Sequence, residues 1–138
     1  MFFKNKETNN KNSDLVKVAA LLIHAAKIDE NFSEQEEKII KETLLKIGAN
    51  SEDLDEVMLN AKKNEENANQ ILEFTKQVKN MAEEDKKKIV ESLWKIIYSN
   101  NTADIYETSL MRRLAGLLYI DNKTMGDIKE KIKKENSQ

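Results

Sequence analysis

The chain has 138 residues, a length that suits one domain. Its 23 basic and 25 acidic residues leave a formal net charge of -2, which argues against a general nucleic-acid binder, since such a protein needs a basic face. The absence of cysteine excludes disulfides and thiolate metal sites and suits a reducing compartment. No apolar run reaches the ~18 residues of a membrane span. We therefore expect a soluble, cytoplasmic protein.

The first segments of the chain predict a flexible arm followed by a buried helix. Residues 1–12 are expected to be loosely held, and residues 13–135 to form a single domain. Ser13 or Asp14 should cap a helix that runs to about Ile28. Because this segment is apolar almost all round, the helix should be central and buried.

A second helix is predicted after the loop at residues 29–32. Ser33 and Glu36 have the spacing of a capping box, and Gly48 supplies a left-handed helix stop. A third helix should begin near Ser51, and the polar residues 62–67 are expected to form a turn.

Four more helices are predicted in the rest of the chain. The fourth covers about residues 71–78, and the fifth runs from near Ala82 through Ile97. Asp104 and Glu107 resemble a second capping box, which opens a sixth helix containing Gly116. Gly116 is expected to permit close helix–helix approach. The seventh helix follows residues 121–122, and residues 133–138 should fray. No segment shows the alternation of a strand, so the fold class is all-α.

An internal repeat is indicated when the chain is shifted on itself by 71 residues. Val18 then aligns with Ile89, and Leu22 aligns with Leu93. The length of the following loop also matches, as does the Glu after it, at positions 36 and 107. These matches predict two related helical-hairpin halves, at about residues 14–60 and 85–131, which pack face to face.

Each half reads as an apolar helix, a polar loop and a second apolar helix. In the first half a Glu follows seven residues after the loop's Asp29, and residues 91–98 carry the corresponding apolar helix of the second half. From about Asp14 to Ile128 this pattern resembles the TerB-like family, named for tellurite resistance. The resemblance implies a bacterial, all-α bundle of about seven helices. It also implies a role in tellurite or stress response and acidic loops suspected to bind metal. Related domains occur beside J-domains in a co-chaperone.

The chain departs from the family pattern in both loops. The Gly that usually follows the Asp is Glu30 in the first loop and Asn101 in the second. The second Asp is replaced by Asn100, which is neutral. Asn tolerates the left-handed conformation that a Gly would take, so the backbone of the loop can be retained. The loss of a carboxylate at Asn100 weakens any metal site shared by the two loops.

The candidate metal ligands are the oxygen-bearing residues of the two loops. They are Asp29, Glu36, Asn100 and Glu107, with Asp104 as a secondary ligand. Calcium or magnesium prefers such oxygens, although neither loop matches an EF-hand. The alternative is that the acids act only as helix caps, because an acid at position 36 or 107 satisfies a free amide and complements the helix dipole.

No motif in the chain indicates an enzyme. The sequence contains no phosphate-binding loop, dinucleotide fingerprint or nucleophile elbow. His24, the only histidine, is expected to be packed with one hydrogen bond. Trp94, Tyr98 and Tyr106 flank the second loop and are expected to be core or half-buried residues; the alternative is that these aromatics line a partner site. We expect a non-enzymatic binding module whose acidic loops hold a divalent cation or contact a partner protein. The alternative is a co-chaperone-like protein adaptor with no metal.

Overall fold

The fold is a bundle of α-helices. The computed structural model describes residues 2–27, 33–67, 71–99 and 105–136; the side chains of 2–11, 105–108 and 136 are not included. The described ranges contain seven helices and no strand, which confirms the predicted fold class. The helices are α1 (Phe2–Ala26), α2 (Glu34–Lys46), α3 (Leu54–Asn67), α4 (Leu72–Lys79), α5 (Glu83–Tyr98), α6 (Ile105–Leu117) and α7 (Asn122–Asn136).

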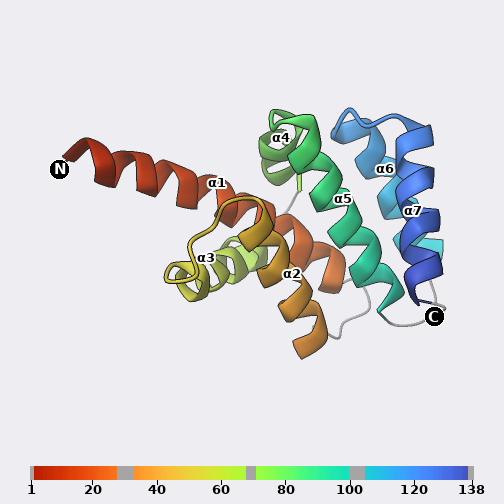
Figure 1. Ribbon diagram of the computed structural model, residues 1–138, viewed down its shortest axis with the longest axis horizontal. Helices are drawn as coiled ribbons and strands as arrows, with labels where there is room; N and C mark the ends of the chain where they lie inside the picture. Colours follow the sequence, from red (N-terminus) through yellow and green to blue (C-terminus); the bar gives the residue numbers. More distant parts are fainter. Residues whose placement is uncertain (1, 28–32, 68–70, 100–104, 137–138) are drawn as a thin grey trace.

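The second half of α1 lies at the centre of the bundle (Figure 1). All six side chains from Val18 to Ile23 are 0% exposed, so the helix is covered on every face. The covering elements are α2, α3, α4 and α5. The prediction of a central helix buried all round is therefore confirmed for this segment.

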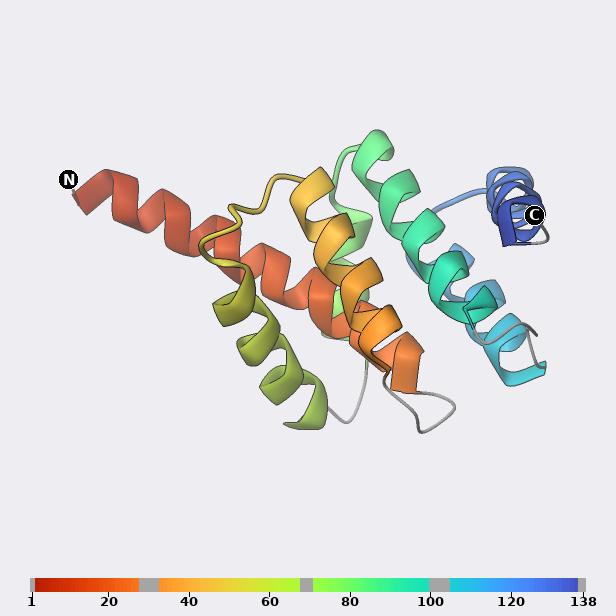
Figure 2. The ribbon, with the colours of Figure 1, turned by 60° about the horizontal axis from the view of Figure 1, so that its bottom comes forward.

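The second central element is α5, which packs against α1, α2 and α7 (Figure 2). Its buried side chains include Ile89, Val90 and Leu93, each 0% exposed. The helices α3 and α7 pack on α1 and α5 respectively, and these two pairs correspond under the 71-residue shift. In contrast, α6 packs on α4. The interpretation as two related halves stays a prediction.

Helix α1 begins at Phe2 and not at Ser13 or Asp14, so the predicted start is wrong. The segment before Ser13 contains no glycine or proline that would end a helix. Its first turns extend beyond the other helices (Figures 1 and 2). The flexibility expected for residues 1–12 stays a prediction.

The turn expected at residues 62–67 is also wrong, because α3 continues to Asn67. Two polar side chains in this stretch have ion-pair partners outside α3. Lys62 Nζ lies 3.2 Å from Glu37 Oε1, and Glu65 Oε2 lies 2.9 Å from Lys27 Nζ. Lys and Glu also have high helix propensity. Likewise, α7 reaches Asn136, so the fraying expected from residue 133 is not seen in the described part.

Two helices end in the same hydrogen-bonded motif. Gly48 has φ 113° and Tyr119 has φ 57°, and the two residues are 71 positions apart. After α2, the amide of Ala49 donates to the carbonyl of Leu44 at 2.9 Å, and after α6 the amide of Ile120 donates to Ala115 at 3.0 Å. Both are Schellman motifs. The helix stop predicted at Gly48 is confirmed.

Gly116 does not mark a close helix–helix contact, as the sequence suggested. It is exposed on α6, and a Cβ added to it would meet no atom within 4 Å. The glycine therefore leaves backbone freedom in the unfolded chain without a packing benefit in the folded one.

We predict that Gly116→Ala raises the free energy of unfolding by about 0.5–1 kcal/mol, because alanine is the better helix former. Urea denaturation followed by circular dichroism measures the change. A lower midpoint with an unchanged slope would contradict the assignment of open space beside Gly116.

Asp121 caps the start of α7. Its Oδ1 accepts a hydrogen bond from the amide of Thr124 at 2.7 Å. This backbone hydrogen bond is the main cause that lowers the pKa of the Asp121 carboxyl from its ordinary value, because it favours the charged form.

A group with a lowered folded pKa stabilises the fold above its unfolded pKa, about 3.9 for Asp, and loses that contribution as the pH falls through the folded pKa. We therefore predict that Asp121→Asn is less stable than the wild type at neutral pH and that this difference shrinks as the pH falls below about 4 and is gone once Asp121 is protonated in the folded protein. Thermal unfolding between pH 2 and pH 7 gives the comparison. A difference that is constant across this range would show that the charge of Asp121 has no role.

Candidate functional site

Only one of the predicted metal ligands can be placed in full. Glu36 lies in the first turn of α2 and its side chain is described. Asp29, Asn100 and Asp104 lie outside the described residues. Glu107 is in α6, but its side chain is not described. The expected approach of the two loops therefore stays a prediction.

Glu36 closes a capping box with Ser33. The amide of Ser33 donates to Glu36 Oε1 at 3.0 Å, and the amide of Glu36 donates to Ser33 Oγ at 3.1 Å. Glu36 is only 1% exposed, so its carboxylate is held inside the structure. This geometry confirms the capping box that the sequence predicts and gives Glu36 a structural role that requires no ion.

His24 lies near the end of α1 beside Glu65 of α3. Its Nδ1 is 3.4 Å from Glu65 Oε1, while Lys27 Nζ is 2.9 Å from Glu65 Oε2. His24 thus has the expected hydrogen bond, but its side chain is 38% exposed and so is less packed than expected. Within the described ranges, no three His, Asp or Glu side chains are grouped to hold a metal ion.

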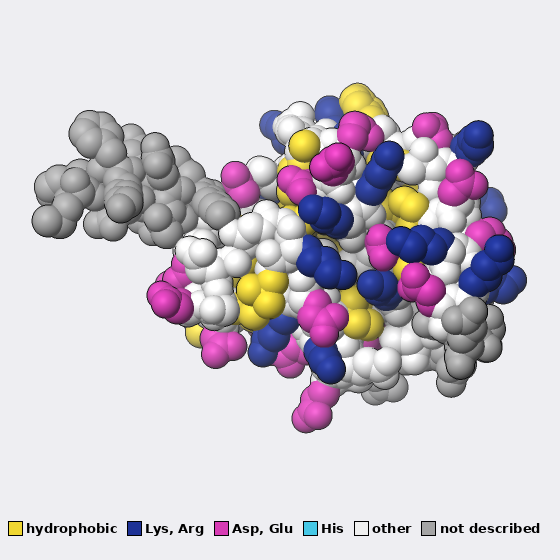
Figure 3. Space-filling view, in the orientation of Figure 1, with side chains coloured by type: hydrophobic (Ala, Val, Ile, Leu, Met, Phe, Trp, Pro, Cys, Tyr) yellow, Lys and Arg dark blue, Asp and Glu magenta, His cyan; other side chains and the backbone are white. Residues whose placement is uncertain are grey.

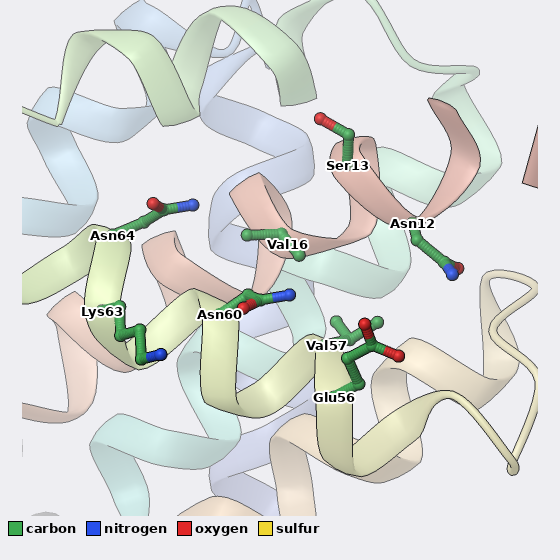
Figure 4. Close-up of a pocket in the computed structure, with 8 residues that line it drawn as sticks. All are labelled: Asn12, Ser13, Val16, Glu56, Val57, Asn60, Lys63 and Asn64. Atoms are coloured by element: carbon green, nitrogen blue, oxygen red, sulfur yellow. The ribbon is translucent and has the colours of Figure 1, made fainter. Parts of the chain in front are cut away.

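A polar groove of about 360 Å³ lies between α1 and α3 (Figure 4). We call it the α1–α3 groove, and its lining residues are Asn12, Ser13, Val16, Glu56, Val57, Asn60, Lys63 and Asn64. Figure 4 shows Asn60 and Asn64 projecting from α3 toward α1. Val16 and Val57 are buried and give the groove an apolar base.

Sequence reasoning did not identify the α1–α3 groove. Its signal was the spacing of Asn60 and Asn64, four residues apart and hence on one face of a helix. The other wall was missed because Asn12 was assigned to the arm and Ser13 to a helix cap. Both residues instead lie within α1.

Basic and acidic side chains are mixed on the surface of the protein. On the face in Figure 3, basic and acidic side chains alternate over the helices. Several of them form ion pairs within or between helices, such as Lys41 with Asp55 and Lys95 with Glu91. Most of these pairs are partly exposed, so each contributes little to stability.

Comparison with models of known protein families shows the family of this chain. The family model for tellurite resistance protein TerB matches residues 15–130, which is most of the 138-residue chain. The chain belongs to the TerB family. The TerB match spans the helical bundle from α1 into α7 and confirms the resemblance drawn from the loops. No curated protein and no solved structure matches the chain significantly. In the described ranges, no helix of this TerB domain has the length and apolar character needed to cross a membrane.

The capping box gives a test of what the Glu36 carboxylate does. We predict that Glu36→Gln changes the free energy of unfolding by less than about 0.5 kcal/mol, because glutamine can also close a capping box, whereas Glu36→Ala lowers it by about 1 kcal/mol or more. Chemical denaturation of both variants measures the contrast. If Gln destabilises the protein as much as Ala does, the negative charge serves a purpose beyond the cap.

Proposed function

We propose that this TerB-family chain is a non-enzymatic, cytoplasmic binding module of the tellurite or a related stress response that acts by contacting a partner protein. The α1–α3 groove is the observation that carries this proposal. Glu36 adds support, because the capping box accounts for an acid that would otherwise indicate a metal ligand.

The chemistry of the α1–α3 groove suits the main chain of a peptide. A carboxamide has both donors and an acceptor, so Asn60 and Asn64 can each pair with the N–H and C=O of a peptide unit. Ser13 on the opposite wall adds a hydroxyl that can donate or accept. The apolar base at Val16 and Val57 offers contact for a small side chain. An extended segment of a partner protein fits this combination.

A divalent cation such as calcium or magnesium is the second candidate ligand. It would be held by Asp29, Glu36, Asn100 and Glu107, with Asp104 as a secondary ligand. The oxygen-rich side chains of both loops favour this candidate. The replacement of an acid by Asn100 argues against it.

Thermal unfolding of chelator-treated protein with and without millimolar calcium, magnesium, manganese or zinc separates the two candidates. We predict no selective shift. A cation bound at a hundred times its dissociation constant would add about 2.7 kcal/mol to stability. A selective gain of that size that is lost in Asp29→Asn would replace the partner-protein proposal with the cation site.

The groove itself is tested by co-purification of partner proteins with the tagged full chain. We predict that the double variant Asn60→Ala, Asn64→Ala loses partners that the wild type retains. Asn67→Ala is the matched control, since Asn67 is exposed on the same helix but does not line the groove. Thermal unfolding verifies that the variants are folded. Identical partners with the double variant would exclude the α1–α3 groove as the contact surface.

A further inference from the structure

A second pocket, of about 180 Å³, lies between α5, α6 and α7. We call it the Trp94 pocket. The apolar part of its wall is formed by Trp94, Met111, Ala115 and Met125, and Asn122 adds a polar side chain. Two cationic residues, Arg112 of α6 and Lys129 of α7, also line it, and none of its lining residues is acidic.

Both cations lack a carboxylate partner in the described part of the chain. Lys129 Nζ lies over the Trp94 ring, 5.5 Å from its centroid, and Arg112 is exposed. Two positive charges therefore stand beside apolar side chains in a pocket whose lining contains no acidic residue.

Trp94 adds an unsatisfied donor. The residue is 3% exposed, and its buried Nε1–H has no hydrogen-bond acceptor among the residues that the structure describes. Buried donors in native proteins are nearly always paired, and indole nitrogen can only donate. Because Trp94 also lines the pocket, an acceptor bound there is a candidate partner for this donor.

We propose that the Trp94 pocket binds the carboxylate of a small organic acid. Arg112 and Lys129 hold the carboxylate by charge-assisted hydrogen bonds, and its short apolar chain lies against Met111, Met125 and the indole. The volume is below the ~300–1,000 Å³ of sites for drug-sized ligands, so the ligand is small. The apolar wall favours an organic acid over a bare inorganic oxyanion. This site is separate from the α1–α3 groove and does not rest on the proposed function.

Trp94 is the only tryptophan of the chain, so its fluorescence reports directly on the pocket. Titration of the full chain with hexanoate should give a saturable change in emission. Hexanamide, which has the same chain without the charge, and sulfate, which has charge without a chain, should give none. The proposal is overturned if hexanoate gives no saturable change in emission at concentrations up to about 10 mM, a range that covers a weak small ligand. It is also overturned if hexanamide gives the same change as hexanoate.

Arg112→Gln should weaken hexanoate binding about tenfold or more, as expected when one charged hydrogen bond is lost. Arg113→Gln is the matched control, because Arg113 is the exposed neighbour that does not line the pocket. Equal weakening in both variants would mean that hexanoate responds to general surface charge, and it would overturn the assigned site.

A blocking variant tests the same site without removing a charge. Gly126 lines the pocket, and a Cβ added there meets no atom within 4 Å, so Gly126→Leu should project a side chain into open space. This variant should abolish the hexanoate response. Gly116→Leu, at another open helical glycine that does not line the pocket, should retain it. Binding that persists in Gly126→Leu would overturn the proposal.

Discussion

The structure depends on the burial of α1 on all of its faces. Six consecutive side chains, Val18 to Ile23, are closed to solvent, and a helix in that state needs neighbours on every side. Four other helices supply them. Of these, α5 is itself buried at half of its residues and contacts α7, while α4 contacts α6. The hydrophobic effect acting on one short segment thus organises most of the bundle.

The parts of the fold that could be predicted from sequence are those set by local signals. The apolar stretch of α1, the capping box at Ser33 and the helix stop at Gly48 are each decided within a few residues, and the structure agrees with all three. The polar end of α3 was predicted as a turn because its residues are polar, but Lys62 and Glu65 have ion-pair partners outside α3. Such partners are distant in sequence and leave no local pattern.

The candidate site was predictable to a smaller extent. Glu36 was identified together with both of its possible roles, and its hydrogen bonds with Ser33 support the role as a cap. The α1–α3 groove and the Trp94 pocket were not identified, because each combines side chains from different helices. Their polar groups are ordinary surface residues in sequence. Only the packing of the helices brings Ser13 of α1 opposite Asn60 and Asn64 of α3, and Arg112 of α6 into one pocket with Lys129 of α7.

The position of α1 in the chain has a consequence for biosynthesis. Its apolar segment leaves the ribosome before α5, yet α5 provides part of its cover. Until about residue 98 has emerged, the nascent chain carries a partly uncovered apolar helix, a state that favours aggregation. The segment that organises the finished protein is therefore partly exposed while much of the chain is still being made.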